Sequence, residues 1–389
     1  RSTPSNSSAA SDVYKRQPYI SISRAFKFGR NLHDLAAEGK VHPALPGLSE
    51  YPRMFANQDK AFEEINKGNH CLISTGTGSG KTEAFLYPIL DHCLKLQDEN
   101  APEGIVAVLV YPMNALAIDQ LQRLRRMLAG SGISFGLYVG TTPTTMNEVR
   151  NVHRMASGEG QEVYKQLAEK FKTRESMQIS PVEERLTERE IEEDPPRILL
   201  TNVKQLEFLM TRRKDIKIFL NAPLKYLVFD EAHTYSGIAG AEVSCLIRRL
   251  RALAGKTADD VICVATSATI VDPQLGEEAP RQFAHRFLGV DKEKISLVQE
   301  EYEDEDFPVE RYKPQRTTEN LIQLLEEILT AIDANDYNTI QSAFEKLTGQ
   351  PISNLSDFET RLFEALKRND YIFNIYRLLQ SSKDINETL

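Results

Sequence analysis

The stretch that decides the fold is Cys71-Leu-Ile-Ser-Thr-Gly-Thr-Gly-Ser-Gly-Lys-Thr82, near the first quarter of a 389-residue chain. Its apolar start predicts a buried strand, and the run Glu83–Leu94 after it predicts a helix. A strand, a glycine-rich turn and a helix in this order are what a phosphate-binding loop requires. The glycines let backbone N–H groups approach phosphate oxygens, and the helix N-terminus adds positive potential. The stretch therefore predicts a site for a nucleoside triphosphate.

Residue types within the loop suggest individual roles. Lys81 would reach the β- and γ-phosphates as a point charge, and Thr82 would ligate Mg²⁺ through its hydroxyl. Thr75 stands where the G-x-x-x-x-G-K-[ST] pattern usually begins with glycine. We expect the nucleotide, ATP with Mg²⁺, to contact the whole loop: Thr75, Gly76, Thr77, Gly78, Ser79, Gly80, Lys81 and Thr82.

Composition places the chain among ordinary globular proteins, with 41% hydrophobic and 26% charged residues. No apolar run is long enough to span a bilayer, so we expect a cytoplasmic protein without a membrane partner. A net charge of −9 argues against non-specific coating of nucleic acid but allows a local basic track. Four cysteines stand singly in apolar segments, which predicts reduced core residues and no metal site.

Further apolar runs predict the rest of a sheet. The expected strands are Val106–Tyr111, Phe135–Val139, Ile198–Thr201, Tyr226–Asp230 and Val261–Thr266. Helical patterns lie between them, at Ala115–Leu128, Lys204–Arg212 and Ala241–Ala254. Alternating strands and helices predict an α/β fold with a doubly wound, mostly parallel sheet covered on both faces. Functional residues should then lie at the carboxyl ends of the strands.

The chain divides into four predicted parts. Residues 1–17 are Ser/Ala-rich and lack an initiator Met, so we expect a disordered segment or sequence scar on a piece of a longer protein. Residues 18–295 form the sheet domain, and 141–196 is predicted to be a charged, helical, mostly solvated insertion, or alternatively a clamp for substrate or partner. An acidic linker at 296–317 precedes a helical region at 318–389. Its expected helices are Leu321–Leu329, Ile340–Leu347, Phe358–Leu366 and Tyr371–Leu379.

A second motif, Leu227-Val-Phe-Asp-Glu-Ala-His233, supplies two adjacent carboxylates after an apolar strand. Asp230 would hold a magnesium ion through its water shell, and Glu231 would orient and deprotonate the attacking water. Ser267-Ala268-Thr269 follows the next strand, where small hydroxyl residues could hydrogen-bond His233 and sense the γ-phosphate. These are the residues that Mg²⁺-dependent hydrolysis of a nucleotide needs.

In this order on successive strands, Gly-Lys-Thr, Asp-Glu-Ala-His and Ser-Ala-Thr resemble superfamily 2 helicases of the DEAD/DEAH type. The resemblance covers about Tyr51 to Gly289 and implies a RecA-like motor domain. It implies catalytic roles for Lys81, Asp230, Glu231 and His233, and a coupling role for Ser267, Ala268 and Thr269. Gln58 resembles the Q motif, whose amide contacts the adenine edge. A small residue is normal at the Thr75 position in this superfamily.

Three other segments resemble nucleic-acid-binding motifs of the superfamily. Tyr111–Ala117 resembles motif Ia, Thr201-Asn202 resembles motif Ib, and Tyr138–Pro143 resembles a Gly-Asp-Thr-Pro motif with Thr141 in place of Asp. With Asp230–Gly237, they look most similar to YprA/MrfA-type, RecQ-related DNA helicases, whose relatives act in genome maintenance and anti-phage defence. The implied nucleic-acid contacts are Pro112, Asn114, Ala115, Gly140, Thr201 and Asn202.

The resemblance implies an ATP-dependent DNA helicase or translocase that moves on single-stranded DNA. No second RecA-like domain with its arginine finger is recognised, so we expect this chain alone to bind ATP weakly and hydrolyse it slowly. A DEAD-type RNA helicase remains an alternative. So does a nucleotide-binding interaction module that recruits protein partners through the 141–196 insertion and the C-terminal helices.

Two arginine-rich stretches allow two interpretations. They are Arg123, Arg125 and Arg126, and Arg248, Arg249 and Arg251, each near the end of a predicted helix. Positive charge is favourable at a helix C-terminus. Alternatively, these side chains contact DNA phosphates, in which case replacing Arg125 should lower the salt dependence of DNA binding.

Overall fold

The computed structural model describes residues 26–76, 78–172, 177–235, 237–267, 276 and 278–303, with short pieces at 330–331, 336–348, 367–368 and 373–374. The chain forms two units, one of Ala25–Glu303 and one of Arg1–Arg24 with Asp304–Leu389. In the second unit, α13 (Tyr337–Thr348) confirms the helix expected at Ile340–Leu347. The other three expected C-terminal helices lie wholly or almost wholly outside the described residues, as does the segment 1–17.

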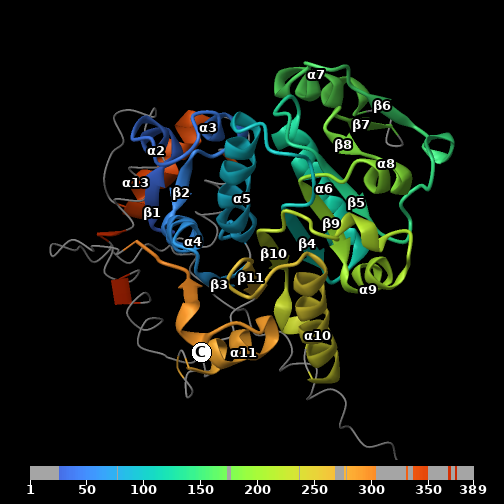
Figure 1. Ribbon diagram of the computed structural model, residues 1–389. Helices are drawn as coiled ribbons and strands as arrows, with labels where there is room; N and C mark the ends of the chain where they lie inside the picture. The colour runs from blue at the N-terminus through green and yellow to red at the C-terminus, as the bar shows by residue number, and fades with distance from the viewer. Residues whose placement is uncertain are drawn as a thin grey trace, which may run out of the picture. The chain divides into compact units, whose positions relative to one another are not determined.

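An eight-stranded sheet organises the larger unit, in the order β12-β3-β11-β10-β4-β9-β5-β8 (Figure 1). Every neighbouring pair in it is parallel. The strands are β3 (His70–Ser74), β4 (Ala107–Tyr111), β5 (Phe135–Tyr138), β8 (Glu184–Arg185), β9 (Ile198–Asn202), β10 (Tyr226–Phe229), β11 (Ile262–Ser267) and β12 (Ile295–Gln299). The predicted doubly wound parallel sheet is confirmed, whereas β8 and β12 were not expected.

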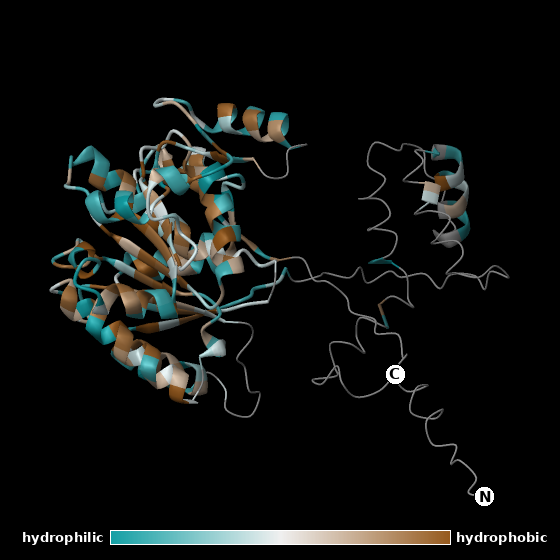
Figure 2. Ribbon diagram, turned by 90° about the vertical axis from the view of Figure 1, so that its right-hand side faces the viewer, coloured by the Kyte–Doolittle hydropathy of each residue, from teal (hydrophilic) through white to brown (hydrophobic). Residues whose placement is uncertain are grey.

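Helices cover both faces of this sheet. One face carries α4 (Ala56–Asn66), α5 (Lys81–Asp98) and α6 (Asn114–Leu128), and the other carries α9 (Val203–Thr211), α10 (Gly237–Leu253) and α11 (Glu278–Leu288). Alternate strand residues enter opposite cores, so Cys71 and Ile73 pack with the first set and Leu72 with the second. Figure 2 shows the mostly hydrophobic strands enclosed between these helices.

A small antiparallel pair lies at the start of this unit. It consists of β1 (Phe28–Asn31) and β2 (Arg53–Phe55), with α2 (Leu32–Ala37) and α3 (Leu45–Leu48) between them. Helix α4 begins at Ala56, directly after β2. At its start, the side-chain oxygen of Gln58 accepts a hydrogen bond from the Phe55 N–H at 2.7 Å.

The insertion at 141–196 differs from the prediction of a solvated helical segment. It contains η2 (Met146–Glu148), β6 (Val152–Arg154), α7 (Gln161–Phe171), β7 (Gln178–Ser180), β8 and α8 (Glu188–Glu193). Strands β6 and β7 pair with each other, and β8 extends the main sheet beside β5. Met155, Tyr164 and Ile179 form a small core with Ala129. The insertion therefore contains helices, as predicted, and most of its residues are at least partly exposed, but its strands and its own apolar contacts were not expected.

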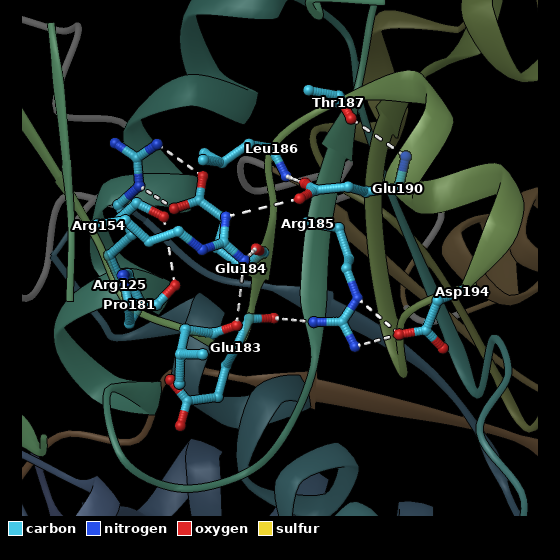
Figure 3. A network of polar contacts seen from close by, with 12 residues as sticks. Arg125, Arg154, Pro181, Glu183, Glu184, Arg185, Leu186, Thr187, Glu190 and Asp194 are labelled. Atoms are coloured by element: carbon cyan, nitrogen blue, oxygen red, sulfur yellow. Dashed lines mark hydrogen bonds and ion pairs between the residues drawn. The ribbon is translucent and has the colours of Figure 1, made fainter. Parts of the chain in front are cut away.

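A buried ion pair connects this insertion to α6 (Figure 3). Arg125 on α6 donates from Nε and Nη2 to the two carboxylate oxygens of Glu184, at 2.7 and 2.6 Å. The two side chains are 3% and 2% exposed. Glu184 is therefore buried, although it lies in an insertion that was predicted to be mostly solvated. Phosphate contact by Arg125 is also excluded in this arrangement, because its guanidinium is enclosed and occupied by the carboxylate.

Two further sequence predictions need correction. The predicted acidic linker at 296–317 begins inside β12, which pairs with β3, and the Glu301 carbonyl then accepts a hydrogen bond from Lys27 N–H at 2.8 Å. Cys71, Cys93 and Cys263 are buried free thiols as expected, but Cys245 is exposed. Within the described residues, no three or more His, Cys, Asp or Glu side chains group together in a way that could hold a metal ion. None of the helices described there has the length and apolar character of a membrane span.

We predict that Arg125→Ala lowers the free energy of unfolding by about 3–5 kcal/mol, because it leaves the Glu184 charge buried without a partner. Arg125→Met combined with Glu184→Leu should recover most of that loss. The control is Arg189→Ala, which removes an exposed ion pair with Glu193 in the insertion and should cost about 1 kcal/mol or less. Urea unfolding measures all three, and equal costs for Arg125→Ala and Arg189→Ala would contradict the prediction.

Candidate active site

The glycine-rich loop leaves β3 at Ser74 and enters α5 at Lys81. Gly78 and Gly80 have φ of +87° and +71°, a region that glycine occupies without strain. The first N–H groups of α5 have no carbonyl partner within the helix, so they are available to an anion. Ser79 Oγ donates to Thr75 Oγ1 at 2.7 Å, and the threonine that replaces the usual glycine thus stabilises the loop.

Two amide side chains from the start of α4 hold the loop from the outside. Asn57 Nδ2 donates to the Ser79 carbonyl at 3.1 Å, and Gln58 Nε2 donates to the Gly80 carbonyl at 3.0 Å. Gln58 is only 5% exposed, and its amide oxygen is already hydrogen-bonded to Phe55 N–H. In this structure Gln58 supports the phosphate loop, and its contact with adenine stays a prediction.

The two adjacent carboxylates lie directly after β10. Glu231 has φ of +50°, a left-handed conformation that is uncommon for a residue with a side chain. This conformation accompanies an ion pair in which Glu231 Oε1 lies 3.2 Å from Lys81 Nζ on the loop. The two residues are 150 positions apart in the sequence. The structure therefore joins the first and second sequence motifs directly.

Asp230 lies beside the neighbouring strand β11. Thr266 donates its hydroxyl hydrogen to Asp230 Oδ1 and accepts a hydrogen bond from the Glu231 N–H at 3.0 Å. Burial raises the pKa of Asp230 above its ordinary value, although the Thr266 hydroxyl opposes that rise. The carboxylate therefore lies in a partly desolvated place where a nearby cation would be favourable.

His233 and Ser267 complete this edge. Ser267 Oγ lies 3.3 Å from His233 Nδ1, and Glu231 Oε2 lies 3.3 Å from the same nitrogen. Ser267 pairs in register with Ser74 at the start of the loop, because β11 lies next to β3. The other two predicted coupling residues, Ala268 and Thr269, lie outside the described residues, as does Thr77.

The residues expected to contact nucleic acid lie at the carboxyl ends of β4, β5 and β9. Asn202 Nδ2 donates to Asn114 Oδ1 at 2.6 Å, so motifs Ia and Ib meet there. Ala115 and Gly140 are exposed, and Pro112 is half-buried. Thr201 is fully buried, and its hydroxyl donates to the Tyr138 carbonyl at 2.7 Å. Its side chain therefore connects two strands and is not open to a ligand.

Sequence reasoning missed three residues that contact this site: Asn57, Thr266 and Glu300. Asn57 stands next to Gln58, and Thr266 is a hydroxyl residue inside an apolar strand, so both carried a signal. Glu300 follows β12 and accepts a hydrogen bond from the Gly76 N–H of the loop. Nothing near Glu300 in the sequence marks this contact, because its partner lies 224 positions away.

Comparison with known proteins gives a consistent result. The model of the DEAD/DEAH box helicase family matches residues 55–157 and 160–275. The chain is similar to the Druantia protein DruE of Escherichia coli (strain UMEA 4076-1), at 30% identity over 72% of this chain and 19% of DruE. It is also similar to the uncharacterized ATP-dependent helicase YprA of Bacillus subtilis (strain 168), at 29% identity over 58% of this chain and 24% of YprA.

A solved structure shares the fold. The DUF1998 helicase MrfA bound to DNA superposes with a TM-score of 0.50 and 20% identity, over 89% of this chain and 44% of MrfA. The chain thus spans about a fifth to a quarter of the curated relatives named here, and less than half of the MrfA chain.

We predict that Gly80→Ala destabilises the protein more than Gly39→Ala. Both glycines have positive φ, which costs alanine about 1–2 kcal/mol. A Cβ at Gly39 meets nothing within 4 Å, whereas one at Gly80 would lie 2.1 Å from Gln58 Nε2. Displacing that amide breaks its hydrogen bonds, so Gly80→Ala should cost about 1–2 kcal/mol more by urea unfolding. In a Gln58→Ala background the extra cost of Gly80→Ala over Gly39→Ala should vanish. If that extra cost persists, the predicted clash between a Cβ at position 80 and the Gln58 amide is wrong.

Proposed function

The chain belongs to the DEAD/DEAH box helicase family, and from that premise we propose that it is the nucleotide-binding motor domain of an ATP-driven DNA helicase or translocase. The observation that carries the proposal is the contact between Lys81 of the phosphate loop and Glu231 after β10. This contact brings the glycine-rich loop and the Glu231 carboxylate to one edge of the sheet, where we propose that they act as a phosphate site and a general base. A site that binds a triphosphate and activates water needs both groups.

Lys81 and Glu231 suggest how nucleotide binding would prepare hydrolysis. In the structure they pair with each other, and both side chains are partly buried, at 12% and 27% exposure. A bound triphosphate would attract Lys81 toward the β- and γ-phosphates, since several negative charges compete with one carboxylate. Glu231 would then be free to accept a proton from a water molecule, with His233 and Ser267 beside it to hold its position.

Thr82 and Asp230 would hold Mg²⁺. Their chemistry fits, because a hydroxyl and a carboxylate are hard oxygen ligands. The raised pKa of Asp230 also indicates a carboxylate whose charge is poorly compensated by the protein alone. When bound, the ion would neutralise charge on the phosphate oxygens. The task of this chain would be to keep the two oxygens in place, through Thr266 for Asp230 and through the start of α5 for Thr82.

Single-stranded DNA is the nucleic acid we propose. Support comes from the carboxyl edge of the sheet, where Asn114, Asn202 and Gly140 lie together, and from MrfA, whose structure of the same fold was obtained with DNA. We also propose that Ala25–Glu303 acts as one motor unit and that the 141–196 insertion serves recognition. The activity of a longer protein would combine this unit with parts that lie beyond it.

We predict that Lys81→Ala raises the Kd for a fluorescent ATP analogue with Mg²⁺ by at least about tenfold, because a hydrogen bond to a charged group contributes about 1.5–3 kcal/mol. Lys67→Ala is the matched control, since Lys67 is an exposed lysine paired with Glu63 away from the loop, and its Kd should equal that of the wild type. The Glu231→Gln variant should still bind the ATP analogue, because Glu231 is proposed to act on the attacking water. Equal affinity of wild type and Lys81→Ala would contradict a phosphate site at the loop.

We also predict that the wild-type chain binds a fluorescein-labelled single-stranded DNA more tightly than RNA of the same sequence. Fluorescence anisotropy at one fixed salt concentration compares the two, since salt alone changes such affinities. Tighter binding of RNA would instead support the RNA-helicase alternative. Absence of binding to both would support a nucleotide-binding interaction module.

A further inference from the structure

A groove of about 420 Å³ lies between α6, the end of β5 and the insertion. Its volume falls within the range of about 300–1,000 Å³ that is typical of pockets for small molecules. The groove is separate from the phosphate loop, and none of the residues that line it belongs to the Lys81–Glu231 site. It exists because the insertion folds back against α6, a feature that the sequence did not reveal.

The walls of the groove combine apolar surface with polar edges. Ile118 on α6 is 41% exposed, and Leu137 of β5 and Leu186 of the insertion, both partly buried, add apolar surface. Gln122 and Asn151 add amide groups at the sides. An apolar wall that also offers amides suits a flat aromatic ring with hydrogen-bonding edges.

The groove is held in a fixed shape by hydrogen bonds behind its surface (Figure 3). The buried Arg125–Glu184 pair forms part of its lining. Arg154 Nη2 donates to the Glu184 carbonyl at 3.0 Å, and the Leu186 N–H donates to Glu190 Oε2 at 2.7 Å. These contacts fix the segment around β8, so a ligand would meet a largely preformed site.

Charge at the groove favours an anion. Its charged lining residues are Arg125, Arg150, Glu184 and Arg185. Glu184 is neutralised by Arg125, and Arg185 donates to Asp194 at 2.6 Å. Arg150 is exposed, and within the described part of the chain no hydrogen bond or ion pair engages its side chain. The uncompensated charge at the rim is therefore positive.

The groove is also continuous with the proposed DNA path. Thr141 and Thr142 line it, and they directly follow Gly140, an expected nucleic-acid contact at the carboxyl end of β5. A strand that follows the sheet edge past Asn114 and Gly140 would reach the mouth of the groove. The groove thus has an apolar wall, a positive charge at its rim and a position next to the proposed DNA path. These three properties suit a nucleotide better than a neutral ligand.

We propose that this groove binds one unstacked base of the single-stranded DNA, with a flanking phosphate at Arg150. The proposal rests on the proposed DNA-binding function and adds a base-binding site made jointly by α6 and the insertion. Ile118 would contact the face of the base, and Gln122 and Asn151 would approach its edges. The insertion thus serves as a clamp on the strand, with the base held away from its neighbours.

The test is fluorescence anisotropy of the whole chain with single-stranded DNA of about 16 nucleotides. Arg150→Ala should weaken binding at least about threefold and reduce the slope of log K against log salt by about 0.7, as expected for loss of one phosphate contact. Ile118→Ala should weaken binding at least about threefold without changing that slope, because it removes only apolar contact. The controls are Arg189→Ala and Leu220→Ala, an exposed arginine and an exposed leucine outside the groove, which should bind as the wild type does.

An abasic site moved along the oligonucleotide identifies the base directly. At one position, loss of the base should weaken wild-type binding, and Ile118→Ala should show little further loss with that same oligonucleotide. If wild type binds DNA and both groove variants bind equally well, the groove proposal is wrong while the proposed function stands, and a protein partner becomes the alternative occupant. If wild type binds no DNA at all, both proposals fail together.

Discussion

The parallel pairing of β3, β11, β10 and β4 is the constraint on which the rest of the structure depends. Strands that run in one direction end at one edge, so side chains that follow them must meet there even when they are distant in sequence. This places Lys81 beside Glu231, Thr266 beside Asp230 and Ser267 beside His233. In each of these contacts the two partners follow or belong to different strands, so the order of the strands in the sheet brings them together. Backbone hydrogen bonds fix the register of these strands, and the helices packed on both faces cover the sheet that positions the site.

Three features distinguish this edge of the sheet. Glu231 has a left-handed backbone, Asp230 is a carboxylate with a raised pKa, and Lys81 and Glu231 compensate each other. Such features are usual at functional sites, where surrounding structure maintains them. In contrast, the side chains of Thr75, Asn57 and Gln58 each form hydrogen bonds that hold the loop in its shape. The site thus combines hydrogen bonds that hold the loop in place with one poorly compensated carboxylate, that of Asp230.

Short sequence patterns predicted the features that depend on neighbouring residues, namely most of the strands and the motifs at their ends. Apolar runs identified six of the eight strands, and the glycine loop and the acidic pair identified the edge where the site lies. They could not identify β8, which consists of Glu184 and Arg185 and lacks any apolar pattern. Nor could they show that Glu184 is buried, since its partner Arg125 lies 59 positions away. Contacts of Gln58 and Glu300 with the loop were missed for the same reason: each depends on how distant segments pack.

Hydrolysis of ATP under single-turnover conditions tests the central claim most directly, because it requires the loop and the carboxylates to act together. The wild-type chain should hydrolyse ATP slowly, single-stranded DNA should accelerate the reaction, and Glu231→Gln should abolish it while nucleotide remains bound. Hydrolysis that continues at the wild-type rate in Glu231→Gln would contradict the account, because the water would then be activated by some other group.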